Sequence, residues 1–326
     1  MRISTPQRRH RRNRRRLLSV GLTAGALLAS YLVSSIYVAS TNRPNAVPAG
    51  LHFVSTGAFE TRFQTWGKGS SQPIVLLHGA FESVATWVPI AERLARNFHV
   101  EAYDLKGYGY TNHVGPYSLR ALAQQLSDFI SVRRLHSPVL VGHSLGAGVL
   151  AQFVLDHPHV ASGIIFLDGD GLSASIPGNF FAELVPEPFR TALYRMAVRS
   201  RWFVSSVWNM ACGDPCPPLR ASDLAEVMAP FSVAGAESAL EDYGRHAIVG
   251  VSVSQRDTLA RWKIPSLVIS GANDVELSNA AARETARAIG APAPIFIPHS
   301  GHLALWSRPQ LVAQAIINFM RLLNKR

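Results

Sequence analysis

One serine is flanked by glycines where an apolar, strand-forming run gives way to a helix-forming segment: Gly142-His143-Ser144-Leu145-Gly146. A Gly-x-Ser-x-Gly turn of this kind holds the serine in a sharp strand-to-helix bend, with its hydroxyl above the sheet. A serine hydroxyl is a weak nucleophile, and it needs a base, a group that orients the base, and N–H donors for the oxyanion. The turn therefore predicts a nucleophile at Ser144 if the rest of the chain supplies these partners.

An aspartate and a histidine follow later apolar runs in the order Ser…Asp…His. Asp274 comes after the run SLVISG, and His302 follows the run PIFIP. Parallel strands would place all three side chains at one edge of the sheet, because each residue stands just past the carboxyl end of a predicted strand. Ser144, His302 and Asp274 are the predicted catalytic residues, and His299, which precedes the turn, is the expected bystander.

The segment His78-Gly79-Ala80-Phe81 follows another apolar run, PIVLL. A backbone N–H of this loop and the N–H of Leu145 together predict an oxyanion hole with two donors. No metal and no cofactor are expected, because the two cysteines of the chain lack a histidine pair at ligand spacing.

Strand-forming and helix-forming segments alternate along most of the chain, which predicts an α/β fold: a mainly parallel sheet flanked by helices on both faces. The predicted strands lie within 59–72, 73–79, 99–109, 138–142, 163–171, 266–271 and 294–298, and the predicted helices are 87–98, 118–134, a segment after Ser144, 278–289 and 309–323. Ser118 is the expected N-cap of its helix.

The alternation stops between about 172 and 258, where no clear buried strand is present. This stretch is predicted to be a helical cap inserted over the sheet. Its aromatic residues are expected mainly to pack between helices, with some of them lining a pocket: Phe180, Phe181, Phe189, Tyr194, Trp202, Phe203, Trp208 and Phe231.

The chain resembles the α/β-hydrolase family from about residue 51 to residue 323, and the likeness is to its cap-bearing branch of esterases, lipases, C–C hydrolases and cofactor-free haloperoxidases. The motifs that carry the resemblance are HGAF at 78–81, YDLKGYG at 103–109, GHSLG at 142–146, GAND at 271–274 and SGH at 300–302. Residues 51–326 are accordingly expected to form one hydrolase domain that carries the cap.

The resemblance implies these roles: Ser144 as nucleophile, His302 as general base and then acid, Asp274 as orienting acid, and Ala80 and Leu145 as oxyanion donors. Some family members take the acid from the end of the preceding strand, which leaves Asp168 and Asp170 as alternatives.

Supporting residues are also expected around this site. Phe81 and His143 are predicted to contribute to the substrate pocket, with the Phe81 ring walling the acyl group. The rings of His78 and His143 are expected to form hydrogen bonds near the site, and Asp104 is expected to be structural.

Family members with aspartate at the nucleophile position hydrolyse epoxides or haloalkanes, whereas serine implies an acyl-enzyme. The predicted function is therefore that of a serine hydrolase of carboxylic esters, with apolar acyl groups because the cap is rich in apolar residues. C–C bond hydrolysis or a perhydrolase- or haloperoxidase-like activity on the same triad is the alternative. A non-catalytic binding module is disfavoured because no triad residue is missing.

The N-terminus is strongly basic and then apolar. Eight arginines lie in residues 1–16, so subtracting them from the net charge of +11 leaves only +3 for the rest. Residues 17–40 carry no charge in 24 positions, which is long enough to cross a bilayer. We expect a cytoplasmic head (1–16), a signal anchor or a signal peptide cleaved after Ser40 (17–40), and a linker (41–50).

This arrangement places the catalytic domain outside the cytoplasm, either membrane-anchored or secreted. The expected partners are a small ester substrate and the membrane. Nucleic acid is not an expected partner, although a basic head alone could bind it. Cys212 and Cys216 are predicted to form a disulfide in an oxidising compartment, with two free thiols as the alternative.

Overall fold

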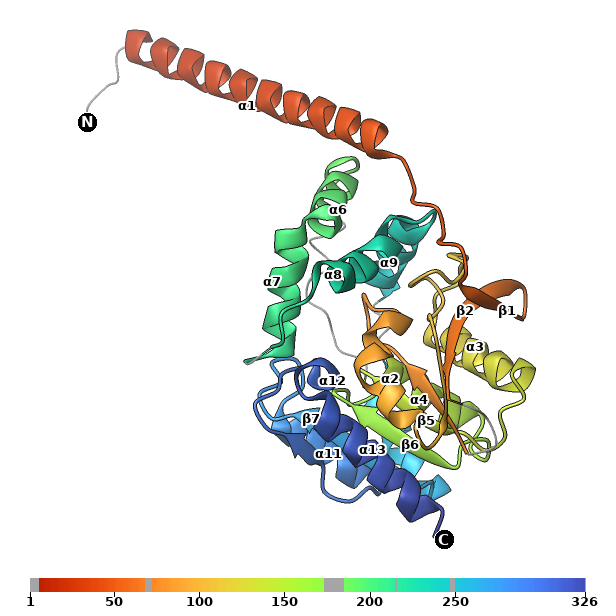
Figure 1. Cartoon of the computed structure of the whole chain (residues 1–326). Helices are drawn as coiled ribbons and strands as arrows, with labels where there is room; N and C mark the ends of the chain where they lie inside the picture. The colour runs from red at the N-terminus through yellow and green to blue at the C-terminus, as the bar shows by residue number, and fades with distance from the viewer. Residues whose placement is uncertain (1–5, 68–71, 173–184, 215, 247–249, 326) are drawn as a thin grey trace, which may run out of the picture. The chain divides into compact units, whose positions relative to one another are not determined.

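Residues 52–297 contain an eight-stranded sheet (Figure 1). The computed structural model describes residues 6–67, 72–172, 185–214, 216–246 and 250–325. The strands are β1 (His52–Thr56), β2 (Phe59–Trp66), β3 (Pro73–Leu77), β4 (His99–Tyr103), β5 (Val139–His143), β6 (Gly163–Leu167), β7 (Ser266–Gly271) and β8 (Ile295–Ile297). Their order is β1-β2-β4-β3-β5-β6-β7-β8, and all pairs from β4 to β8 are parallel. The prediction of a mainly parallel sheet is confirmed.

The two strands at the β1 edge are antiparallel, since β1 pairs with β2 and β2 pairs with β4 in that sense. One strand was predicted here, within 59–72, and β1 was not predicted. This strand has five residues and is mostly exposed, so it lacks the continuous apolar run that identifies a buried strand.

Alternating side chains of the central strands enter two separate cores. Val75 and Leu77 pack with α3 (Leu119–Val132), α4 (Leu145–Asp156) and α11 (Asn279–Ala288) on one face. Ile74 and Leu76 pack on the other face with helices α2 (Val88–Leu94), α12 (Ala304–Ser307) and α13 (Pro309–Leu323). Both faces of the sheet are covered, as parallel sheets require.

The helix start predicted at Ser118 is confirmed. The Ser118 side chain accepts a hydrogen bond of 3.1 Å from the backbone N–H of Ala121, in the first turn of α3.

Five helices lie between β6 and β7 in the described part of the chain: α6 (Phe189–Arg199), α7 (Arg201–Cys212), α8 (Ala221–Met228), α9 (Ala236–His246) and α10 (Val253–Thr258). Within the described residues of 172–258, β-pairing is limited to isolated bridges, Leu172 with Val251 and Val233 with Asn45. Phe180 and Phe181 lie outside the described residues. The helical character expected for this insertion agrees with its described residues.

The expected linker is attached to this insertion. The backbone N–H of Asn45 donates to the carbonyl of Ser232 at 2.7 Å, beside the bridge to Val233. From Asn45 onwards the linker therefore belongs to the same compact unit as the sheet.

A second compact unit consists of residues 1–43 and 180–197, and residues 44–179 with 198–326 form the first. In the second unit, α1 (Pro6–Thr41) continues back through the arginine-rich head, since arginine is a good helix former. The part of α1 long and apolar enough to span a membrane is Ser19–Thr41, with a mean hydropathy of 1.6.

A buried arginine holds α6 against the end of α1 within this unit. Arg195 is 5% exposed, and its guanidinium donates to the carbonyl of Val38 (2.5 Å), to Thr41 Oγ1 (2.9 Å) and to Asn42 Oδ1 (3.4 Å). The last carbonyls of a helix have no intrahelical donor, and the last turn of α1 contains no basic residue. Arg195 supplies both the donor and a favourable charge.

Candidate active site

The turn at Ser144 has the strained geometry that its sequence predicts. Ser144 has φ 48° and ψ −116° between the end of β5 and the start of α4, a region that non-glycine residues rarely occupy. A Cβ on Gly142 would lie 2.4 Å from the carbonyl oxygen of Gly146, and one on Gly146 would lie 2.2 Å from that of Leu77. Both glycines are required because backbone segments meet here without room for a side chain.

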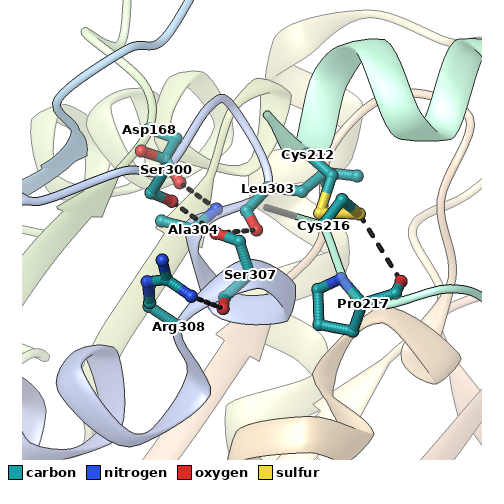
Figure 2. Close-up of a disulfide and its surroundings, with 9 residues drawn as sticks. All are labelled: Asp168, Cys212, Cys216, Pro217, Ser300, Leu303, Ala304, Ser307 and Arg308. Carbon is teal, nitrogen blue, oxygen red and sulfur yellow. Dashed lines mark hydrogen bonds between the residues drawn. A yellow bond between two sulfur atoms is a disulfide. The ribbon is translucent and has the colours of Figure 1, made fainter. Parts of the chain in front are cut away.

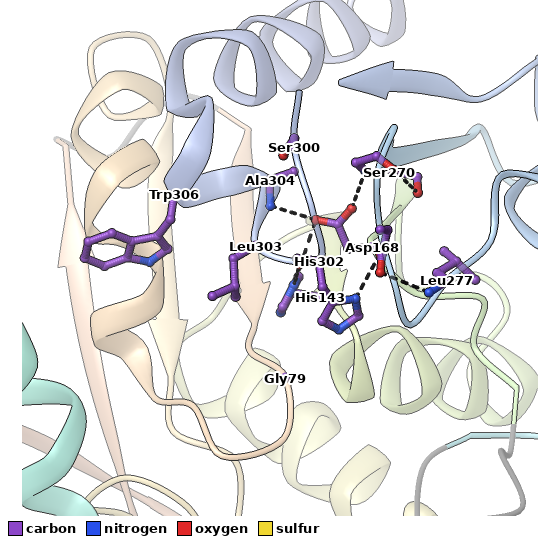
Figure 3. A network of polar contacts seen from close by, with 12 residues as sticks. Gly79, His143, Asp168, Ser270, Leu277, Ser300, His302, Leu303, Ala304 and Trp306 are labelled. Carbon is purple, nitrogen blue, oxygen red and sulfur yellow. Dashed lines mark hydrogen bonds and ion pairs between the residues drawn. The ribbon is translucent and has the colours of Figure 1, made fainter. Parts of the chain in front are cut away.

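The structure joins His302 to Asp274, and Figure 3 shows His302 close to His143 and Asp168. His302 Nδ1 lies 2.9 Å from Asp274 Oδ2, and the other oxygen of this carboxylate accepts the N–H groups of Glu276 (2.8 Å) and Leu277 (3.0 Å). With the ring proton on Nδ1, His302 Nε2 is left as an acceptor. Burial lowers the pKa of His302, but the hydrogen bond to Asp274 and the negative charges of Asp274 and Glu276 together raise it above its ordinary value.

Ser144, the third predicted catalytic residue, is connected to this pair through its neighbour His143. His143, the residue before Ser144, bonds through Nε2 to the carbonyl of His302 at 2.8 Å, and the two rings are 5.2 Å apart. Among the described residues, Ser144 Oγ has no hydrogen-bonded partner. His302 Nε2 instead lies 3.4 Å from the carboxylate of Glu276, which is 60% exposed.

The alternative acids have other partners. Asp168 accepts hydrogen bonds from the N–H groups of Gly271 (2.7 Å) and Ala304 (3.2 Å), and thereby joins the ends of β6 and β7 to α12. Burial raises the pKa of Asp168 to about 7. Asp170 accepts the N–H of Leu172. Of the three candidate acids, Asp274 is the one hydrogen-bonded to His302.

The two predicted oxyanion donors lie on segments that meet at the turn. The N–H groups of Ala80 and Leu145 have no acceptor among the described residues, and Leu145 begins α4, where helix N–H groups are unpaired. A Cβ on Gly79 would lie 3.0 Å from Ser144 Cβ. The loop that carries Ala80 is therefore packed directly against the serine.

The predicted pocket residues differ in exposure. Phe81 is 59% exposed, and its ring contacts those of Tyr108 and Phe231 at centroid distances of 6.5 and 6.4 Å. His143 is fully buried, and both of its ring nitrogens have partners. Substrate contact by His143 stays a prediction. Its ring partner Glu82 was not among the residues predicted from the sequence. An acidic residue inside an otherwise apolar, glycine-containing loop was the available signal.

The structural roles expected for His78 and Asp104 agree with their contacts. His78 Nδ1 donates to the carbonyl of Gly79 at 2.7 Å, and Nε2 accepts the N–H of Leu105 at 2.9 Å. Asp104 accepts the N–H groups of Val84 and Tyr110. These bonds fix the loop after β3, which contains Gly79, and the loop after β4, which contains Leu105 and Tyr110.

The predicted disulfide is confirmed, and it lies at the end of α7 beside the His302 loop (Figure 2). Cys212 and Cys216 are bonded, with their Cα atoms 5.5 Å apart. The carbonyl of Cys212 accepts the N–H of Gly301 (2.9 Å), and that of Ala211 accepts the N–H of Leu303 (3.2 Å). The insertion thus holds both neighbours of His302. No cluster of three potential metal ligands occurs in the part of the chain that the structure describes.

Comparison with known proteins agrees with this geometry. A family model described as "Alpha/beta hydrolase family" matches residues 74–315, well over half of the chain. An uncharacterized protein of Mycobacterium tuberculosis is 31% identical over 133 residues, which are 40% of this chain and only 38% of that protein. The pimeloyl-[acyl-carrier protein] methyl ester esterase of Vibrio vulnificus is 25% identical over 80% of this chain and 98% of its own.

Solved structures also share the fold. A structure described as a membrane phospholipase A, a novel bacterial virulence factor, has a TM-score of 0.69 at 20% identity, covering 96% of this chain and 100% of that one. At this identity the similarity shows the fold. Together with the esterase relative, the family match supports hydrolytic activity.

We predict that Asp168→Ala lowers the free energy of unfolding by about 2–4 kcal/mol, because two buried backbone N–H groups lose their acceptor. Chemical denaturation measures this change. Asp170→Ala is the matched control and should cost clearly less, because Asp170 accepts one N–H, from Leu172, and is only partly buried. Equal losses in the two variants would contradict the role of Asp168.

Proposed function

Because the chain belongs to the alpha/beta hydrolase family, we propose that it is a serine hydrolase that cleaves carboxylic esters through an acyl-enzyme on Ser144. The observation that carries the proposal is the His302–Asp274 hydrogen bond of 2.9 Å beside a serine in a strained strand-to-helix turn. This combination supplies a nucleophile, a base whose second ring nitrogen is Nε2, and a group that fixes the tautomer.

The proposed reaction has two steps. Ser144 Oγ attacks the ester carbonyl while His302 Nε2 takes its proton, and the N–H groups of Ala80 and Leu145 stabilise the oxyanion. His302 then gives the proton to the leaving alcohol, and the acyl group stays on Ser144. Water, deprotonated by His302, releases the acid and restores the serine. Asp274 stabilises the histidine cation formed in each step.

An apolar acyl group is supported by the aromatic rings near the oxyanion loop. Phe81 directly follows Ala80 and exposes more than half of its side chain. Phe231, from the helical insertion, contacts this ring, and so does Tyr108. Three aromatic side chains next to the oxyanion position favour an apolar chain over a charged one.

We further propose that the N-terminal helix is a retained anchor that holds the catalytic domain outside the cytoplasm. The support comes from Arg195, whose partners lie on both sides of Ser40: Val38 before it, and Thr41 and Asn42 after it. Cleavage after Ser40 would remove Val38 and leave a buried guanidinium with fewer acceptors, which is costly.

The first test is a burst assay with p-nitrophenyl esters of graded chain length, using the full-length chain in detergent. We expect a rapid release of about one p-nitrophenol per enzyme, followed by slower turnover. The reason is that p-nitrophenol leaves in the acylation step, whereas the slower deacylation step limits turnover. Ser144→Ala should abolish the burst. A folded protein that neither turns over any ester nor labels with a fluorophosphonate at Ser144 would overturn the proposal.

The proposed acid is tested by Asp274→Asn. We expect kcat to fall by about 10³–10⁴-fold, because the amide introduced at this position donates to Nδ1 of His302 and leaves the ring proton on Nε2, which then cannot accept a proton from Ser144. Asp170→Asn is the matched control and should retain activity. A loss of less than about tenfold in Asp274→Asn would argue for another acid.

Retention of the anchor is tested by the mass of the protein isolated from membranes. We expect the intact 35.5 kDa chain. Detergent should release it and alkaline carbonate should not, because carbonate removes proteins held at the membrane by charge and leaves a membrane-spanning helix in place. A chain that begins at Thr41 would show that the segment is a cleaved signal peptide.

A further inference from the structure

His143 is a histidine whose two ring nitrogens both face acceptors. Nδ1 lies 3.1 Å from both carboxylate oxygens of Glu82, and Nε2 lies 2.8 Å from the carbonyl oxygen of His302. A neutral imidazole carries one N–H and could satisfy one acceptor only. Both contacts are satisfied when the ring is protonated on both nitrogens. His143 is therefore a buried cation paired with the Glu82 anion.

The pair is enclosed in the protein. The side chain of His143 is fully buried, and that of Glu82 is 10% exposed. Burial opposes both charges, but their mutual attraction outweighs it, so the pKa of His143 is raised to about 9 and that of Glu82 is lowered. The ion pair is accordingly present at neutral pH.

Three segments meet at this pair. Glu82 also accepts the backbone N–H of Gly79 at 2.8 Å, the residue before Ala80. A Cβ on Gly79 would lie 2.9 Å from His143 Nδ1 and 3.0 Å from Ser144 Cβ. Glu82 thus accepts a hydrogen bond from the loop of Gly79. His143 belongs to the turn at Ser144, and the Nε2–H of His143 donates to the carbonyl of His302.

We propose that the buried Glu82–His143 ion pair is a positioning pair that fixes the loop of Ala80 and the backbone of His302 relative to Ser144. The inference rests on the proposed function and deepens it: one pair of side chains sets the donor, the base and the nucleophile at once. Catalytic geometry of this kind depends on distances held within about 0.5 Å.

The pair also has an electrostatic consequence for His302. The charged groups around the His143 ring are Glu82, Asp168, whose carboxylate is 4.0 Å from Nε2, and His302, whose ring is 5.2 Å away. His78 is close enough to have its pKa lowered by His143, although burial lowers it more. The His143 cation lowers the pKa of His302, whereas Asp274 and Glu276 raise it.

The test is the pH dependence of kcat/KM in Glu82→Gln, measured with the full-length chain and the best p-nitrophenyl ester. The glutamine amide can donate to a neutral Nδ1, and its oxygen can still accept from Gly79, so the hydrogen bonds survive while both charges disappear. With the cation gone, the pKa of His302 rises. The acid limb, where activity is lost as His302 becomes protonated, should therefore move to higher pH.

Two further variants give the sign of the effect. Glu276→Gln removes an anion 3.4 Å from His302 Nε2, so its acid limb should move to lower pH. Glu92→Gln, at an exposed position of α2, should leave the wild-type profile unchanged. An acid limb in Glu82→Gln that coincides with that of the wild type would overturn the electrostatic coupling.

The positional role is tested by Glu82→Ala, which removes the acceptors of Gly79 and His143. We expect kcat to fall at least about tenfold with little change in KM, because the oxyanion donors act mainly in the transition state. A wild-type kcat in this variant would overturn the positioning role.

A measurement on the unaltered protein covers the case in which the variants do not fold. In ¹⁵N NMR of histidine-labelled protein, we expect one ring that stays protonated on both nitrogens up to about pH 9, and that is missing in His143→Gln. A neutral His143 ring at neutral pH would overturn the ion pair. Absence of Ser144-dependent turnover in the wild type would instead overturn the proposed function, whatever the NMR result.

Discussion

A Cβ on Gly146 would lie 2.2 Å from the carbonyl oxygen of Leu77. Gly146 is the second residue of α4, and the helix can start at this place only because that residue has no side chain. This close approach brings the start of α4 against the end of β3. The loop that follows β3 then packs on Ser144, and it delivers Ala80 and Glu82 to the same place. The strained φ of Ser144 is maintained because the surrounding backbone leaves no alternative path.

The edge of the parallel sheet supplies the other groups. β5, β6 and β7 end side by side, and their carboxyl ends carry Ser144, Asp168 and the loop of Asp274. Asp168 is not hydrogen-bonded to the side chain of His302 in the described part of the chain. It accepts backbone N–H groups from two neighbouring segments and so stabilises the edge on which Asp274 and His302 meet.

The helical insertion contacts the loop of His302 as well as Phe81. Carbonyl groups at the end of α7 bind the residues on both sides of His302, and Gly301 has no side chain because a Cβ would lie 2.4 Å from the carbonyl oxygen of Ala211. The Cys212–Cys216 disulfide closes a short loop directly after this contact. The same insertion brings Phe231 to Phe81, next to the oxyanion loop.

Strong local signals made much of this predictable. Buried parallel strands are continuous apolar runs, so the sheet from β3 to β8 was recognisable, and glycine spacing identified the turn at Ser144. The edge strand β1 was missed because it is short and largely exposed. The disulfide was predicted from the spacing of two cysteines and from the expected export of the chain. The fold class and the turn at Ser144 both follow from local periodicity and glycine placement. The amino-acid sequence was therefore enough to establish them, together with the types of residue available for the site.

The choice of acid for His302 depended on the folded chain. Asp168, Asp170 and Asp274 all follow strands, and the paths of their loops are what separate Asp274 from the other two. Tertiary contact likewise decided the pairing of Glu82 with His143, since residues 61 positions apart meet only when two strands lie side by side.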